Sequence, residues 1–173
     1  MQDSEPFHSQ TYFDHDRLRF DPATCINALT LFYSYGRGEE LGMSLQWVRE
    51  VLRYRAYIDG TRHYSPDNIL LLLTRLLASS DGLELQELQP LLKERVQERL
   101  GAQGDAVALA MRVLKCHFVD IRDEVDLSTL LSMQCEDGGW EAGWVYKYSS
   151  GVKIGNRGLT TALAVQAIQE IGQ

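Results

Sequence analysis

One short stretch of the sequence places a carboxylate, a guanidinium and two phenols close together: Tyr57, Asp59, Arg62 and Tyr64. A carboxyl group among aromatic rings suits either a poised acid or the stabilisation of a cation, and a guanidinium beside it orients it. We therefore select Asp59 as the candidate catalytic acid, with Tyr57, Arg62 and Tyr64 as its catalytic partners. The alternative is a salt-bridged turn, because Asp59 followed by Gly60 is a common turn pair.

A second aromatic segment runs from 135 to 158. It holds six glycines, two tryptophans and two tyrosines. Loops of this length inside a compact domain are usually functional or packed on themselves. We predict that Trp144, Tyr146 and Tyr148 bind substrate by shaping an apolar pocket, in which the ring faces stabilise positive charge.

The same segment carries the basic residues Lys147, Lys153 and Arg157 just before the last predicted helix. Free amide groups at a helix N-terminus favour anions, and lysine and arginine bind phosphate oxygens. Lys147 and Arg157 are therefore candidate substrate-binding residues for an anionic group such as a diphosphate. The alternative is that these side chains are simply solvated on a loop.

Metal and cofactor chemistry is not indicated. The four histidines have no metal-ligand spacing, the three cysteines form no C-x-x-C pair, and no aspartate-rich motif calls for Mg²⁺. Gly155 and Gly158 lack the preceding strand of a nucleotide-binding fingerprint. We expect no metal and no cofactor.

Charge and composition narrow the class of protein. Among 173 residues, 24 Asp and Glu against 17 Lys and Arg give a formal charge of -7, which opposes binding to a phosphate backbone. The N-terminus lacks the order of a signal peptide, and no apolar run approaches membrane-spanning length. We expect a soluble cytoplasmic protein with reduced thiols, no nucleic-acid partner and no stable membrane insertion.

Apolar residues recur at helical spacing almost everywhere after Asp21, which predicts an all-α fold. The polar and aromatic residues 1–20 are expected to form an N-terminal extension, and residues 21–173 a single domain. Seven helices are predicted, caps included, at 21–36, 44–57, 65–77, 90–101, 105–119, 126–134 and 159–171.

The segment that begins the aromatic loop has a recognisable pattern. Gln134, Asp137 and Trp140 belong to a Gln-x-x-Asp-Gly-Gly-Trp run, followed later by a Leu-Thr-Thr-Ala-Leu helix start at Leu159. This combination resembles the QW-type repeat of the terpene cyclase and protein prenyltransferase α/α-toroid superfamily, which includes squalene-hopene cyclases. The resemblance implies a partial α/α toroid of antiparallel helix hairpins.

The residues of this run suggest structural roles. A glutamine at a helix end bridges unpaired backbone groups, glycines permit a tight turn, and an indole packs over the corner. Gln134, Asp137 and Trp140 are therefore predicted to be structural residues. Upstream, residues 47–64 are similar to the terpenoid-cyclase-like region of long fungal proteins, some joined to a haloacid-dehalogenase-like region. The resemblance covers roughly Asp14 to the C-terminus.

One family feature is missing. Class II members of the superfamily begin their reaction with an Asp-x-Asp-Asp or Asp-x-Asp-Thr acid, and the nearest match here is Asp14-His15-Asp16. We interpret Asp14 and Asp16 as surface carboxylates and Asp21 as a helix N-cap, and expect the acidic motif of longer relatives upstream of this region.

The resemblance implies an enzyme of terpenoid or related secondary metabolism that cyclises or isomerises a hydrophobic polyene or cyclic substrate of the isoprenoid class. The alternative is a non-catalytic isoprenoid-binding module, or one that completes another protein's toroid, which the missing acid favours. A purely structural helical scaffold explains the helices but not the aromatic loop. Because an incomplete ring leaves an open face, we expect a homo-oligomer or a partner protein.

Overall fold

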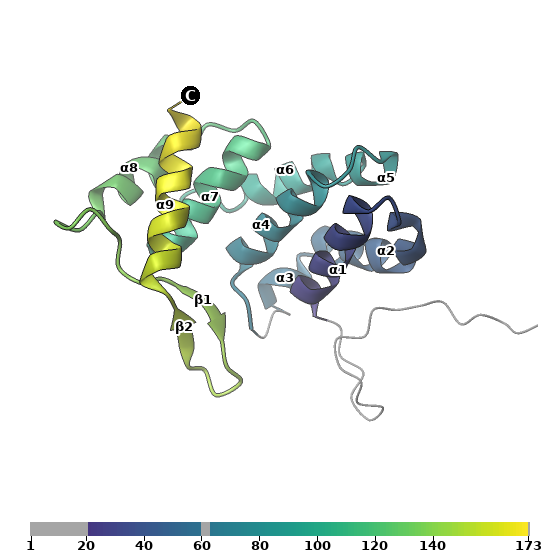
Figure 1. Cartoon of the computed structure of the whole chain (residues 1–173), viewed down its shortest axis with the longest axis horizontal. Helices are drawn as coiled ribbons and strands as arrows, with labels where there is room; N and C mark the ends of the chain where they lie inside the picture. The colour runs from purple at the N-terminus through teal and green to yellow at the C-terminus, as the bar shows by residue number, and fades with distance from the viewer. Residues whose placement is uncertain (1–20, 60–62, 173) are drawn as a thin grey trace, which may run out of the picture.

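The computed structural model describes residues 21–59 and 63–172, which fold into α-helices and one small sheet (Figure 1). The prediction of an all-α fold is confirmed. Within these ranges, no helix combines the length and the apolar character needed to cross a membrane. The elements are α1 (Pro22–Ser34), η1 (Gly38–Leu41), α2 (Gly42–Arg53), α3 (Ala56–Asp59), α4 (Pro66–Leu77), α5 (Leu83–Gln86), α6 (Gln89–Gln97), α7 (Ala106–Phe118), α8 (Glu124–Ser132), β1 (Trp144–Lys147), β2 (Lys153–Gly155) and α9 (Arg157–Ile171).

The longer helices begin where capping residues were expected. The side chain of Asp21 accepts a hydrogen bond from Thr24 N at 3.0 Å, which confirms it as the N-cap of α1. Asp105 caps α7 in the same way. Each cap satisfies an amide that has no partner within the helix, so it fixes where the helix begins.

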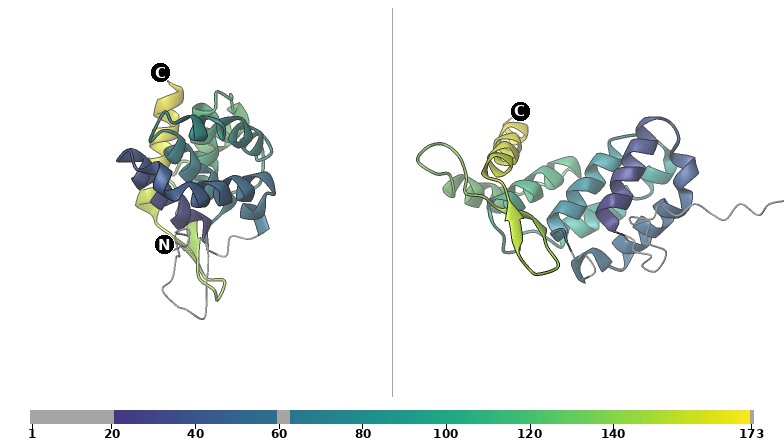
Figure 2. Two further views of the ribbon diagram at one scale, coloured as in Figure 1. Left: turned by 90° about the vertical axis from the view of Figure 1, so that its right-hand side faces the viewer. Right: turned by 60° about the horizontal axis from the view of Figure 1, so that its bottom comes forward.

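Two departures from the predicted elements affect the site. The expected helix over 44–57 is divided into α2 and α3, because Arg55 adopts a left-handed backbone with φ of 56°. The aromatic segment also contains an antiparallel hairpin, β1 and β2, in place of a loop without regular structure. In Figures 1 and 2 this hairpin projects from the helical body.

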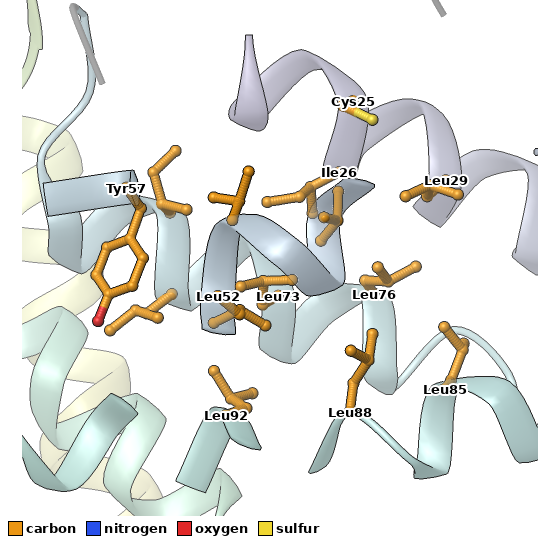
Figure 3. Packing of buried hydrophobic residues seen from close by; sticks show 14 of the residues in the cluster. Cys25, Ile26, Leu29, Leu52, Tyr57, Leu73, Leu76, Leu85, Leu88 and Leu92 are labelled. Atoms are coloured by element: carbon orange, nitrogen blue, oxygen red, sulfur yellow. The ribbon is translucent and has the colours of Figure 1, made fainter. Parts of the chain in front are cut away.

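The apolar core consists of two clusters. The first is formed by α1 to α6 with the C-terminal end of α7, and Figure 3 shows side chains such as Ile26, Leu52 and Leu73 meeting within it. The second is formed by α7, α8 and α9 and includes Trp140. Because α4 packs on α7, these two helices connect the clusters. The partial toroid, and the division into an extension and one domain, remain predictions; residues 1–20 lie outside the described ranges.

A network of buried charges joins α4 to α7. Asp67, on the first turn of α4, accepts a hydrogen bond from Lys115 Nζ at 2.6 Å and from Arg99 at 2.9 Å. Arg112 binds Asp126 of α8 at 2.6 Å and lies 3.4 Å from Asp67. Burial acts to raise the pKa of Asp67, but Lys115 and Arg99 outweigh it and hold the pKa below its ordinary value.

Replacing Asp67 should therefore be costly. Asp67→Asn leaves the Lys115 ammonium, which is 0% exposed, without its carboxylate, and we expect a loss of about 3–5 kcal/mol in the free energy of unfolding. Because folding lowers the pKa of Asp67, the wild type should lose this stabilisation as the pH falls through the acid range, and the variant should lose less. Urea unfolding at several pH values measures both effects.

The controls are a double variant and a surface variant. Asp67→Asn with Lys115→Met should recover part of the loss, because no uncompensated ammonium remains. Glu40→Gln removes the exposed ion pair with Arg37 and should leave the unfolding midpoint nearly unchanged. Equal effects of Asp67→Asn and Glu40→Gln would contradict the importance of the buried network.

Candidate functional site

The hairpin is attached by main-chain pairing to the segment between α3 and α4. Tyr146 and Tyr64 form an antiparallel β-bridge, and Lys147 N donates to His63 O at 2.7 Å. His63 Nδ1 lies 2.9 Å from Lys147 O. Because a carbonyl oxygen only accepts, Nδ1 is the protonated nitrogen of this contact. Two segments about eighty residues apart in the chain therefore meet at the start of α4.

Tyr146 lies at the centre of an aromatic cluster. Its ring stacks on His63 with the centroids 5.2 Å apart and the planes 9° from parallel. Tyr64 and Tyr148 each meet it edge to face with centroids 5.5 Å apart. These are favoured geometries for aromatic pairs. We define His63, Tyr64, Tyr146 and Tyr148 as the aromatic cluster; its electron-rich ring faces are suited to attracting a cation.

The structure thus brings one predicted catalytic residue, Tyr64, together with the predicted substrate-binding residues Tyr146 and Tyr148. Tyr57 is 0% exposed and packs in the first apolar cluster (Figure 3); burial, reinforced by the negative charge of Glu98, raises its pKa. Asp59 ends α3, but its side chain lies outside the described part of the structure, as does Arg62.

Trp144 is held where the hairpin meets α7. Its amide donates to Asp105 Oδ2 at 2.9 Å, while Oδ1 of the same carboxylate caps α7 at Ala108 N. A Cβ added at Gly143 would lie 2.4 Å from Val107, so only glycine allows this close approach. The Lys153 ammonium lies 4.9 Å from the centroid of the half-buried Trp144 indole, in a cation-π contact.

Arg157 forms an ion pair that joins the two ends of the aromatic segment. Its guanidinium contacts both oxygens of Asp137, at 2.7 and 2.8 Å. The hydrogen bond from Arg157 lowers the pKa of Asp137, and the carboxylate in turn raises the pKa of Arg157. A diphosphate would therefore have to compete with Asp137 for this side chain. Lys147 lies on β1, where its main chain pairs with His63.

The corner before the hairpin is closed by hydrogen bonds of its own. Gln134 Nε2 donates to Gly138 O at 2.8 Å, which supports the bridging role proposed for this glutamine. Trp140 is 1% exposed, and its Nε1 donates to Leu130 O at 2.7 Å. Its backbone amide donates to Thr161 Oγ1 at the start of α9. Trp140 thereby links α8, the corner and α9, through its indole on one side and its backbone amide on the other.

Sequence reasoning missed two residues of this arrangement. His63 was considered only as a metal ligand, although its place beside Tyr64 suggested a further aromatic contact. Asp105 was expected to begin a helix, and nothing in its position indicated that the second oxygen would bind the hairpin. Asp14 and Asp16 lie outside the described residues. Within the described ranges, no group of three or more His, Cys, Asp or Glu side chains is placed to hold a metal ion.

The two tryptophans should respond differently to truncation. Trp140→Ala removes a fully buried indole and its hydrogen bond, and we expect a loss of about 3–5 kcal/mol in the free energy of unfolding. Trp144→Ala should cost less, because its ring is only half-buried, and should mainly weaken ligand binding. Chemical denaturation of both variants measures the order; equal losses would contradict these separate roles.

Comparison with known proteins gives this arrangement a context. The sesquiterpene cyclase astC-like C-terminal domain family matches residues 3–35. The chain is 47% identical over 161 residues to drimenol cyclase drtB of Aspergillus calidoustus, an alignment that covers 91% of this chain and 30% of that protein. No solved structure matches significantly. The chain thus spans less than a third of its relative's length, and these similarities support a terpene cyclase-like family.

Proposed function

We propose that this chain is part of a terpenoid cyclase or isomerase of secondary metabolism, acting on a hydrophobic isoprenoid polyene or cyclic substrate. The observation that carries the proposal is the pairing of Tyr64 with Tyr146, which gathers the aromatic cluster from two distant segments. Such rings stabilise the positive charge that develops when an alkene is protonated or a diphosphate leaves. The similarity to a drimenol cyclase supports the same class of chemistry.

The proposed substrate contacts follow from this cluster. Tyr146 and Tyr148 would offer ring faces to the reacting carbons, with Trp144, Lys147 and Arg157 as further substrate contacts. Tyr64, which is half-buried, would line the same region through its ring contact with Tyr146. The deep burial of Tyr57, on α3, supports a role in positioning that helix rather than contact with substrate.

The acid is proposed to be Asp59. Protonating an alkene requires a carboxylic acid that stays protonated until it reacts, and a site with restricted access to water favours that state. Asp59 ends α3, two residues after the buried Tyr57 and five before Tyr64 of the cluster. In this proposal Arg62 orients the carboxyl group.

A second candidate function is a non-catalytic module that binds an isoprenoid or completes another protein. It is favoured by one observation of the sequence: Asp14-His15-Asp16, the nearest match to the family's acidic motif, is followed by neither Asp nor Thr.

The Asp59→Asn variant tests the enzymatic proposal. We expect the wild type to convert farnesyl diphosphate or a cyclic terpenoid intermediate into products detected by gas chromatography with mass spectrometry. Asp59→Asn should abolish product while its circular dichroism spectrum remains that of the wild type. Asp14→Asn, Asp16→Asn and the exposed control Asp81→Asn should have little effect.

Three other results would contradict this assignment. Unfolding of Asp59→Asn would identify a structural residue, and loss of product in Asp14→Asn or Asp16→Asn alone would place the acid there. Saturable binding by a wild type that forms no product would favour the module instead.

We also propose that the chain self-associates or binds a partner protein. α8 exposes Val125 and Leu131 at 66% and 46%, apolar surface that association would cover. Light scattering at micromolar concentration should detect a dimer, and Leu131→Lys should shift it toward monomer. A monodisperse wild-type monomer that binds no apolar dye would contradict self-association.

A further inference from the structure

A cavity of about 410 Å³ lies where α4, α7 and α9 meet, apart from the aromatic cluster. This volume lies in the range of small-molecule sites, which are mostly apolar with a few polar groups. Figure 1 shows α9 running from the hairpin to the C-terminal end alongside α7. The apolar part of the cavity wall consists chiefly of Leu71, Leu72, Met111, Leu114, Phe118 and Leu163.

The two ends of this groove differ in chemistry. Leu159, on the first turn of α9, and Asn68, on the first turn of α4, follow directly from the hairpin and from the segment paired with it. Arg75, His117 and Glu170 lie on the last turns of the three helices. All ionisable residues of the groove therefore lie at its end away from the hairpin, which we call the polar end, and none lies at the end next to the hairpin.

The polar end contains an available guanidinium. Among the described residues, Arg75 has no ion-pair partner, and its side chain is exposed. Glu170 is also present, but one of its oxygens accepts a hydrogen bond from Gln166 Nε2 at 2.7 Å. A guanidinium binds phosphate oxygens through two parallel hydrogen bonds, and an imidazole adds another donor. This end is therefore suited to an anionic head group.

We propose that the groove between α4, α7 and α9 binds an isoprenoid diphosphate as an extended chain. The diphosphate contacts Arg75 and His117, and the apolar tail runs toward Leu159 and the aromatic cluster. This inference rests on the proposed function for its ligand class and adds the site and the orientation. From Asn68 to Ala78, α4 spans about 15 Å, which accommodates several isoprene units.

The groove suits an extended isoprenoid better than the hairpin does. One ring face of Tyr146 is stacked on His63, Arg157 is bound to Asp137, and the Lys153 ammonium lies over Trp144. The aromatic cluster is therefore suited to contact the hydrocarbon end of the isoprenoid, far from its diphosphate, rather than to enclose the whole ligand. With its head bound at Arg75, the polyene presents its terminal double bond to the cluster.

The test is equilibrium binding of farnesyl diphosphate and of farnesol to the full chain by titration calorimetry. Leu163→Arg places a charge in the apolar wall and should weaken binding of both ligands at least tenfold. Val165→Arg is the matched control, because this partly exposed residue of the same helix does not line the groove. The affinity of this variant for both ligands should be unchanged. Leu72→Arg tests the opposite wall if Leu163→Arg fails to fold.

Arg75→Gln tests the orientation. It should weaken binding of farnesyl diphosphate about tenfold and leave that of farnesol unchanged, because only the diphosphate uses the guanidinium. Glu170→Gln should strengthen diphosphate binding by removing a nearby negative charge. An equal effect of Arg75→Gln on both ligands, or none on either, would overturn the proposed orientation.

The groove itself is rejected if the wild type binds neither ligand saturably, or if folded Leu163→Arg and Leu72→Arg bind as the wild type does. These outcomes are separate from those of the turnover assay. Product formation that is unchanged in Leu163→Arg would reject the groove and leave the cyclase proposal standing. Groove-dependent binding without any product would retain the groove and reject catalysis.

Discussion

The carboxylate of Asp67 is the interaction on which the arrangement of this molecule most depends. It lies on the first turn of α4, is almost fully buried, and is bound by Lys115 of α7 and by Arg99. The buried ammonium of Lys115 and the partly buried guanidinium of Arg99 would be unfavourable here without this carboxylate. Because Tyr64 is only three residues earlier in the chain, the same network sets where the partner strand of the hairpin lies.

Asp105 fixes the position of the hairpin relative to α7. One oxygen of its carboxylate holds the first turn of α7 and the other holds the amide of Trp144, so α7 positions both α4 and the hairpin. The aromatic cluster and the groove therefore share one supporting helix. A movement of α7 would alter the distance between the polar end of the groove and the aromatic rings.

Much of the fold could be predicted from the sequence because capping residues and apolar spacing act locally. Asp21, Ser65 and Asp105 begin helices where they were expected to. The hairpin was not predicted, although Val145 and Tyr146 are strand-forming residues and Ser149 to Gly151 suit a turn. Its glycine content favoured a loop. The pairing of Tyr64 with Tyr146 depends on contacts distant in the chain, which no local pattern encodes.

The attachment of the hairpin has a consequence for how such a site diversifies. Backbone atoms supply the contact of Lys147 N with His63 O and the bridge between Tyr64 and Tyr146. Exchange of the side chain at Tyr146 or Tyr148 leaves these backbone donors and acceptors in place. Related chains can therefore vary the shape and polarity of the aromatic surface while retaining the same scaffold, and selection for a new product can act on a few positions without rebuilding the fold.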